Sequence, residues 1–349
     1  MAIEPVILSA ATVLWAAGFL LIGRFRTFPR KSKSLPARSI SVIIPARNEE
    51  HNLPILLQSL REQSPRPCEI IVVDDASTDR TAAVAREHGA TVLAGCPLAE
   101  GWRGKTWACH QGAKIARGDW LLFVDADAWF ESGGLACITS HFTGGAFSAG
   151  PFHAVRRPYE DLSLFFNLAM TVGTVPGGLF GQMLLVDRES YQRVGGHEAV
   201  KDRILENLSL AGRFRAAGIE VRSVTGRGAI SFRMYPGGLR ELMDGWTKAF
   251  AAGAGQTRRA TMGIVVAWMI GLMLAPIGWI VLGDETLWMV FYLCCAGQVG
   301  WFARRVGAFR RITALVYPLP LIFFFLVFAR SALRSGRQVN WKGRVIRAD

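Results

Sequence analysis

The sequence lacks the cysteine spacings of a disulfide framework or a structural metal site. Its six cysteines include no CxxC pair and no grouping with histidine, and they are Cys68, Cys96, Cys109, Cys137, Cys294 and Cys295. Secreted disulfide scaffolds and zinc ribbons both depend on such spacings. We therefore expect reduced cysteines that behave as small apolar residues in a cytoplasmic context.

Acidic residues are scarce relative to basic ones, with 27 Asp and Glu against 40 Lys and Arg and a net charge of +13 over 349 residues. A basic excess can indicate nucleic-acid binding. Here, however, the cations flank apolar runs, in residues 24–33, 304–311 and 330–347. Attraction to anionic lipid head groups explains that placement better. No nucleic-acid partner is expected.

The first apolar run, residues 3–22, has no cation before it and contains only Glu4 as a charged residue. A signal peptide carries basic residues ahead of its apolar stretch, whereas here they follow. About 20 residues are enough to cross the ~30 Å hydrocarbon layer. Residues 1–23 are therefore predicted to be a transmembrane anchor in a bacterial cytoplasmic (inner) membrane. The positive-inside rule places the chain from residue 24 onward in the cytoplasm.

Further apolar runs follow near the carboxyl end. Residues 262–303 read as a transmembrane hairpin with a short acidic turn at residues 283–285. Residues 312–329 are about long enough for one crossing, yet a crossing would export the basic tail, residues 330–349. Pro318 and Pro320 also interrupt helical hydrogen bonding there. We expect a re-entrant or interfacial helical pair with a cytoplasmic tail, and whether this segment crosses is left open.

The middle of the chain, residues 38–235, alternates strand and helix patterns. Strands are predicted at residues 40–44, 69–74, 91–94 and 120–124, with helices between them. This alternation predicts a parallel, doubly wound sheet, in which ligands bind beyond the carboxyl ends of the strands. Polar clusters stand at three of those ends, at residues 45–49, 74–75 and 125–127. Any one of them is explained by a turn or a helix cap, but three together indicate a ligand site.

The residue types suit a nucleotide sugar. The charge on its departing diphosphate is neutralised by Mg²⁺ or Mn²⁺ held by hard oxygen ligands. Asp125 and Asp127, two positions apart in a chain expected to be extended, would point to one side and reach one metal ion. Lys105, after the flexible Gly104, is placed to offer a cation to phosphate. Lys105 is equally compatible with a solvated residue in the first turn of a helix.

At these residues the chain resembles the inverting family 2 glycosyltransferases. The shared motifs are SVIIPARNEE (41–50), IIVVDDASTD (70–79), GWRGKTWAC (101–109) and LLFVDADAWF (121–130). The resemblance implies a GT-A nucleotide-sugar-binding fold, Rossmann-like with a mostly parallel sheet. It also implies a nucleotide-sugar site formed by Pro45, Arg47, Glu49, Asp74, Asp75, Gly104, Lys105 and Asp125, with Asp125 and Asp127 as metal ligands and Asp127 and Glu206 as catalytic residues.

A narrower resemblance covers residues 195–211 and 231–254, which are similar to bacterial carotenoid glycosyltransferases. Those enzymes attach glucose from UDP-glucose to the carboxyl group of an apocarotenoid acid. Hopanoid-associated glycosyltransferases are a broader match. Two departures stand out: the family's Glu-Asp base motif is Glu206-Asn207, and its QxxRW motif keeps only Trp246. A carboxylate acceptor is already ionised at neutral pH, so loss of the base aspartate is less harmful if the acceptor is a carboxylate.

The acceptor is expected to come from the bilayer. Apolar residues at helical spacing predict an amphipathic interface helix in residues 236–258, with Trp246 at head-group depth. A helix packed into the protein core is the alternative. Arg233, Trp246 and Lys248 are candidate acceptor contacts, although Arg233 fits a structural ion pair equally well, and His197 is a candidate for a metal or acceptor site. A hopanoid, glycolipid or polyprenyl-phosphate acceptor remains open, and so does a membrane scaffold without activity.

Overall fold

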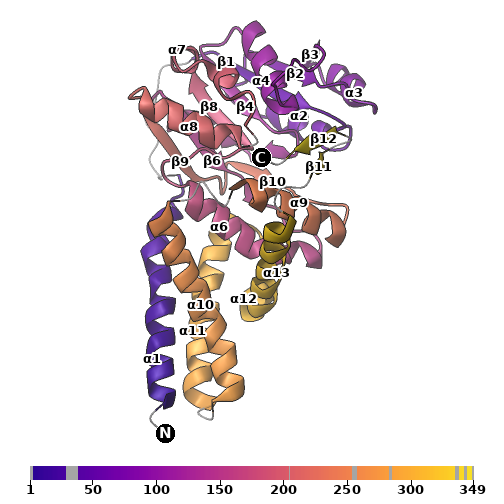
Figure 1. Ribbon diagram of the computed structural model, residues 1–349. Coiled ribbons are helices and arrows are strands. Elements are labelled where there is room, and N and C mark those ends of the chain that lie inside the picture. Colours follow the sequence, from indigo (N-terminus) through magenta and orange to yellow (C-terminus); the bar gives the residue numbers. More distant parts are fainter. Residues whose placement is uncertain are drawn as a thin grey trace.

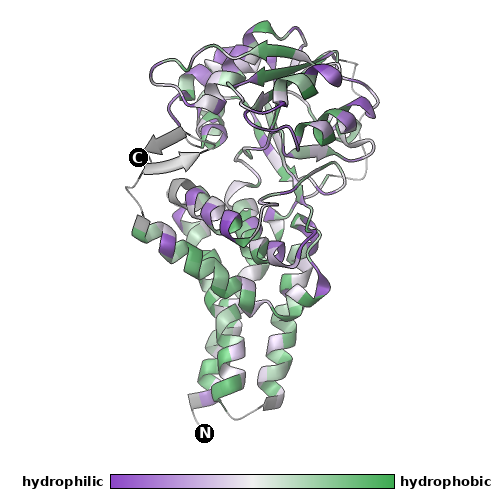
Figure 2. Ribbon diagram, turned by 90° about the vertical axis from the view of Figure 1, so that its right-hand side faces the viewer, coloured by the Kyte–Doolittle hydropathy of each residue, from purple (hydrophilic) through white to green (hydrophobic). Residues whose placement is uncertain are grey.

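The computed structural model describes residues 3–28, 38–203, 205–253, 258–282, 285–334, 338–341 and 344–347. A domain of mixed helices and strands lies at one end, and long helices extend from it (Figure 1). Figure 2 shows that these helices are predominantly hydrophobic, whereas the domain beyond them mixes hydrophilic and hydrophobic segments.

A seven-stranded sheet forms the centre of the domain, in the order β3-β2-β1-β4-β8-β6-β9. The first four strands along the chain are β1 (Ile40–Ala46), β2 (Glu69–Asp74), β3 (Thr91–Ala94) and β4 (Trp120–Val124). They pair in parallel, as the sequence predicts. Helices α2 (Leu53–Arg61), α3 (Thr81–Glu87) and α4 (Gly104–Ile115) make the crossovers. The sheet is therefore mostly parallel, as expected for a GT-A fold.

Helix α4 approaches the sheet unusually closely at Gly112. A Cβ atom at this position would lie 2.5 Å from Cγ2 of Ile43 on β1 and 3.0 Å from Cγ2 of Val73 on β2. Glycine is therefore required there by close packing. The contact fixes the first turn of α4, which carries Lys105, relative to the ends of the strands.

Three strands complete the sheet beyond β4: β8 (Met183–Asp187), β6 (Ala146–Gly150) and β9 (Val221–Thr225). Strand β8 is antiparallel to both β4 and β6, and β6 is parallel to β9. A smaller sheet combines β5 (Ala128–Phe130), β10 (Ile230–Phe232) and β7 (Phe152–His153). Helices α5 (Gly134–Ser140), α7 (Arg188–Arg193) and α8 (Glu206–Ala216) and the 3₁₀ segment η3 (Gly196–Val200) complete this part.

Within the described residues, three helical segments are long and apolar enough to span a membrane: Glu4–Arg24, Arg259–Val281 and Thr286–Val306. They comprise α1 (Ile3–Ala16) with the 3₁₀ segment η1 (Ala17–Arg24), then α10 (Arg259–Val281) and α11 (Glu285–Val306). Together these helices form the helical bundle, called the bundle below. The helical pair expected near residues 312–329 is present as α12 (Arg311–Leu315) and α13 (Pro318–Arg334), beside the upper half of the bundle (Figure 1). Strands β11 (Gln338–Trp341) and β12 (Arg344–Arg347) pair near the carboxyl end.

The bundle and the domain are joined by a polar clamp on the 3₁₀ segment η2 (Pro158–Ser163). The Asp161 carboxylate is 5% exposed and accepts hydrogen bonds from Arg310 Nε at 2.6 Å and from Thr313 Oγ1 at 2.7 Å. The backbone of Ala308 also donates to the carbonyl of His153 at 2.8 Å. The segment after α11 and the start of α12 are thus hydrogen-bonded to the α/β domain.

Helix α9 (Leu239–Gly253) forms where an interface helix is predicted, but the predicted placement of Trp246 is wrong. Trp246 is 2% exposed, stacks on Phe166 of α6 (Leu164–Thr174), and donates its indole N–H to Ser163 Oγ at 3.0 Å. Its polar atom therefore has a partner inside the protein and does not need the head-group region. The side chain of Phe250, predicted on the same face, lies outside the described residues.

Candidate active site

The carboxyl ends of β1 and β2 are tied together by the residues predicted to hold the nucleoside. The Arg47 guanidinium donates to the carbonyl of Asp75 at 2.6 Å, and the Asp75 N–H donates to the carbonyl of Ala46 at 2.8 Å. Pro45 is half-buried at the end of β1, and the Asp75 side chain is buried. Arg47 and Asp75 therefore share one edge of the sheet.

Two residues of this predicted set make local contacts. The Asp74 carboxylate accepts the Ser77 N–H at 3.1 Å and closes the turn after β2. Glu49 Oε2 accepts the side-chain amide of Asn52 at 2.9 Å. Both contacts lie where the chain leaves a strand. Asp74 and Glu49 therefore have the local role in turns that the sequence also predicts as the alternative to ligand binding.

Lys105 is the centre of the charged part of the site. Its ammonium lies 2.7 Å from the carboxylate of Asp125 and 3.1 Å from that of Glu206, and it donates to the carbonyl of Gly181 at 2.8 Å. Burial alone would lower the pKa of Lys105, but the two carboxylates outweigh burial and raise it above its usual range. Lys105 is therefore a permanent cation at the end of β4.

Asp125 and Asp127 do not lie along an extended chain as predicted. Strand β4 ends at Val124, and the Ala128 N–H donates to the carbonyl of Asp125 at 3.2 Å, which closes a turn. Asp125 pairs with Lys105, whereas Asp127 follows on the turn, its carbonyl facing the N–H of Arg233 at 3.4 Å. The period-two argument fails because the strand stops one residue before the motif.

Glu206 and Asn207 open helix α8 and are 5% and 4% exposed. The Asn207 amide donates to the carbonyls of Phe180 at 2.7 Å and Gly181 at 3.3 Å. An ionised aspartate could not make these bonds, because a carboxylate only accepts. Asn207 thus has a structural role that the sequence did not reveal, and it explains one departure from the family pattern.

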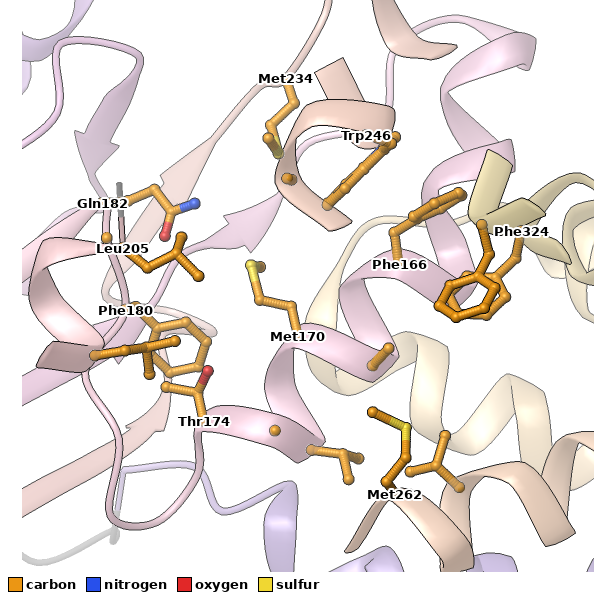
Figure 3. A pocket seen from close by; sticks show the side chains of 18 of the residues that line it. Phe166, Met170, Thr174, Phe180, Gln182, Leu205, Met234, Trp246, Met262 and Phe324 are labelled. Atoms are coloured by element: carbon orange, nitrogen blue, oxygen red, sulfur yellow. The ribbon is translucent and has the colours of Figure 1, made fainter. Parts of the chain in front are cut away.

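An apolar cavity of about 360 Å³ begins beside this charged group. Its polar end is formed by Gly181, Gln182, Glu206 and Asn207, and its walls come from α6, α9, α10 and α13. Figure 3 shows Phe180, Gln182 and Leu205 on one side and Phe166 and Phe324 on the other, with Met170 between them. Neither Gln182 nor the cavity itself was predicted, because the lining residues are scattered along the chain.

The far end of the cavity lies among the apolar helices. Val266 and Ile270 of α10, with Phe325 and Phe328 of α13, line the cavity and are 39–47% exposed. These are residues of the surface that would face lipid in a membrane. The cavity therefore connects the apolar surface of the bundle with Glu206.

The predicted acceptor contacts divide between the cavity and elsewhere. Trp246 lines the cavity. Arg233 instead forms a partly buried ion pair with Glu160, with two guanidinium nitrogens 2.6 and 3.1 Å from Glu160 Oε1, so its structural alternative is the one observed. Lys248 is half-buried on α9 and does not line the cavity.

His197 is enclosed in the fold. It is 1% exposed, and Nδ1 lies 2.8 Å from the hydroxyl of Tyr191. Burial, assisted by the positive charge of Lys105, lowers the pKa of His197 to about 3. Within the described part of the chain, no three His, Cys, Asp or Glu side chains are grouped closely enough to hold a metal ion by themselves.

Comparison with known proteins identifies the family of the chain. Residues 41–148 match the model of glycosyl transferase family 2. The chain is 33% identical over 357 aligned residues to 4,4'-diaponeurosporenoate glycosyltransferase of Staphylococcus aureus strain MRSA252, with 95% of each chain covered. The same protein from strain USA300 gives the same identity and coverage.

Among solved structures, the fold resembles a mannosyltransferase from Pyrobaculum calidifontis in complex with GDP-Man and Mn²⁺. The TM-score is 0.55 at 18% sequence identity, covering 94% of this chain and 98% of the other. This likeness shows a shared GT-A fold. With relatives of this similarity along nearly its whole length, the chain belongs to glycosyl transferase family 2 and is a glycosyltransferase.

Proposed function

We propose that this protein is a membrane-bound inverting hexosyltransferase that transfers glucose from UDP-glucose to the carboxyl group of an apocarotenoid acid, forming a glycosyl ester. The observation that supports this most directly is the apolar cavity between the bundle surface and Glu206. Its volume is within the range of ligand pockets, and its walls suit a hydrocarbon chain. The most similar relatives reported above are named for an acceptor of this kind.

In the proposed sugar-donor site, Pro45, Arg47, Glu49 and Asp75 surround the nucleoside at the edge shared by β1 and β2, with Asp74 closing the adjacent turn. Lys105, which follows Gly104 at the start of α4, meets the diphosphate. Its contact with Asp125 in the free protein would be exchanged in part for phosphate oxygens. An ammonium group placed in this way stabilises the charge that develops on the departing UDP.

A divalent cation, Mg²⁺ or Mn²⁺, fits the oxygen chemistry of Asp125 and Asp127. Such ions are commonly held by one or two carboxylates together with substrate phosphates. Among the described residues no third His, Cys, Asp or Glu completes a metal site with these two aspartates, which suits a metal that arrives with the nucleotide sugar. The cation would supply Lewis-acid stabilisation of the leaving diphosphate. Support comes from the fold relative, whose complex contains Mn²⁺.

We infer that Glu206 acts as the general base even for a carboxyl acceptor. An acid that enters through an apolar cavity is desolvated, which favours its protonated form. The described residues lining this cavity include no lysine or arginine. Glu206 would take the acceptor's proton, and the resulting carboxylate oxygen would attack the anomeric carbon. The bond from that carbon to the diphosphate would break, UDP would leave with the electron pair, and the configuration would invert.

The membrane arrangement supports a bacterial inner-membrane location with the catalytic domain, residues 38–235, in the cytoplasm. Arg24 ends η1, while Arg304 and Arg305 lie in the last turn of α11. These cations would mark the cytoplasmic side of the anchor (1–23) and of the hairpin (262–303). The helix predicted at 236–258, the segment at 312–329 and the basic tail, 330–349, would then lie on that side.

The proposal is tested with the full-length protein in vesicles supplied with radiolabelled UDP-glucose and one candidate acceptor at a time. We expect label in the lipid phase with an apocarotenoid acid, loss of transfer with EDTA, and recovery with Mn²⁺ or Mg²⁺. Transfer to a hopanoid, a glycolipid or a polyprenyl phosphate in place of the acid would replace the proposed acceptor. Faster transfer from another nucleotide sugar would replace the proposed donor. Absence of metal-dependent UDP binding would favour the scaffold alternative.

A further inference from the structure

Tyr235 occupies a strained position between the two proposed substrate sites. Its backbone has φ +57°, in the left-handed region that a residue with a large side chain rarely adopts. The Tyr159 hydroxyl donates to the Tyr235 carbonyl at 2.9 Å and holds this conformation. Strain of this kind is retained where the surrounding structure enforces it, and it is frequent at functional sites.

The phenol ring lies in space that α9 leaves open at Gly245. A Cβ atom at Gly245 would lie 2.0 Å from Cε1 of the Tyr235 ring and 2.6 Å from its hydroxyl. In the QxxRW pattern, position 245 would carry the arginine. The Tyr235 phenol therefore occupies the space next to α9 that a side chain at position 245 would need.

The residues around Tyr235 and Gly245 place the Tyr235 phenol between the proposed sugar-donor site and the apolar cavity. Arg233, two residues before Tyr235, faces the backbone of Asp127, and the charge of Asp127 acts on Tyr235. On the other side, Met234 and Trp246, the chain neighbours of Tyr235 and Gly245, both line the apolar cavity (Figure 3). Among the residues that the structure describes, none accepts a hydrogen bond from the Tyr235 hydroxyl. This hydroxyl is available to a ligand.

We propose that Tyr235 is a positioning residue whose hydroxyl donates a hydrogen bond to an anionic substrate oxygen where the sugar donor and the acceptor meet. The inference rests on the proposed function and adds the residue that orients the reactants. That oxygen belongs either to the diphosphate or to the acceptor carboxylate. Both are anionic acceptors of a hydrogen bond, and experiment distinguishes them.

The test compares Tyr235→Phe with the wild-type protein in vesicles. Loss of a hydrogen bond to a charged oxygen is expected to lower kcat/KM by about ten- to a hundredfold. If the oxygen is in the diphosphate, the KM for UDP-glucose and the Kd of UDP with Mn²⁺ rise. If it is in the acceptor, UDP binding is unchanged and the KM for the acid rises. Tyr292→Phe is the matched control, because the Tyr292 hydroxyl on α11 donates to the carbonyl of Leu315 on α12 and neither residue lines the cavity.

Gly245→Ala provides a second variant, because an added methyl group must displace the Tyr235 ring. We expect it to change the same kinetic parameter as Tyr235→Phe, and by more. A Tyr235→Phe protein with wild-type values for every parameter overturns the inference, and a defect confined to Gly245→Ala would then show a packing role alone. Absence of transfer by the wild-type protein itself would instead refute the proposed function, whatever the variants do.

Discussion

The ammonium of Lys105 lies 3.1 Å from the carboxylate of Glu206, and Glu206 lines the polar end of an otherwise apolar cavity. Lys105 also contacts Asp125, so one cation joins a predicted metal ligand to the proposed base. An arriving acceptor would therefore meet the proposed base next to the cation proposed to meet the diphosphate.

Glu206→Gln keeps the size of the side chain but removes its ability to take a proton. If Glu206 is the general base, kcat should fall by about 10²- to 10⁴-fold while UDP binding is preserved. Single-turnover assays with saturating acceptor measure this. Glu198→Gln, at an exposed position of η3, is the control. Full activity of Glu206→Gln would indicate the base-free route, in which the acceptor arrives already ionised.

Val266→Trp should narrow the mouth of the cavity on α10. We expect the KM for the lipid acceptor to rise about tenfold or more, because a large ring reduces access, while the KM for UDP-glucose is unchanged. Ile277→Trp on the same helix is the matched control: both residues are 47% exposed, but Val266 lines the cavity and Ile277 does not. Equal effects of the two substitutions on the acceptor KM would argue against entry at this mouth.

Asn207→Asp restores the residue typical of the family, yet it should impair this protein. A carboxylate at position 207 would face the carbonyls of Phe180 and Gly181, which now accept hydrogen bonds from the amide. We expect a loss of about 1–3 kcal/mol in the free energy of unfolding, larger at neutral than at acidic pH because a protonated carboxyl can donate. Thermal unfolding in detergent measures it, with Asn207→Ala as the uncharged comparison. An Asn207→Asp protein more active than the wild type would refute the structural role.

His153 should make the folded state sensitive to acid. Burial lowers the pKa of His153 from 6.5 to about 4, partly offset by the charge of Glu160. Between these values the unfolded chain binds the extra proton and the folded chain does not, so stability falls as the pH falls from about 6.5 toward 4. At ~1.4 kcal/mol per pKa unit, the loss approaches about 3 kcal/mol.

His153→Gln should flatten this part of the stability profile, measured by denaturant unfolding from pH 4 to pH 7. His51→Gln is the control, because the His51 side chain is 92% exposed. If His153→Gln and the wild type lose stability in parallel over this range, the buried imidazole is not the source of acid sensitivity.

Asp161→Asn should weaken the clamp between the catalytic domain and the bundle. The buried carboxylate is bound by Arg310 and Thr313, and hydrogen bonds to a charged group contribute roughly 1.5–3 kcal/mol. We expect a lower Tm for the full-length protein and faster proteolysis near residue 310. Glu87→Gln, which breaks the exposed Arg80–Glu87 pair, should change the Tm little. An unchanged Tm in Asp161→Asn would exclude a stabilising role for the clamp.

The sequence predicted the first half of the sheet well because those strands are local and regular. Each is a short, largely apolar run such as Val42–Ile44, and a helix lies between each strand and the next. Parallel pairing follows from that alternation. The last three strands of the large sheet were not predicted. Strand β8 pairs antiparallel with β4 at a separation of about sixty residues, which no local pattern reveals.

The charged half of the site was also largely predictable, since Lys105 and Asp125 stand in motifs and the structure brings them into contact. The apolar half was not. The cavity depends on how α6, α9, α10 and α13 pack, and hydrophobic spacing on one helix cannot tell a lipid-facing stripe from one turned inward. Trp246 illustrates this, because its spacing fits both placements and only the packed structure reveals its bond to Ser163.

The hydrogen bonds of Asp161 to the segment after α11 also affect which lengths of acceptor molecule the protein could accept. Because these hydrogen bonds tie the domain to the ends of the hydrophobic helices, the protein itself would set the depth of Glu206 relative to a bilayer if those helices span one. Under the proposed function, an acceptor must rise by a defined amount before its reactive end reaches the sugar. The protein would then select lipid acceptors by how far they can extend out of the hydrocarbon layer, before any contact recognises a particular group on them.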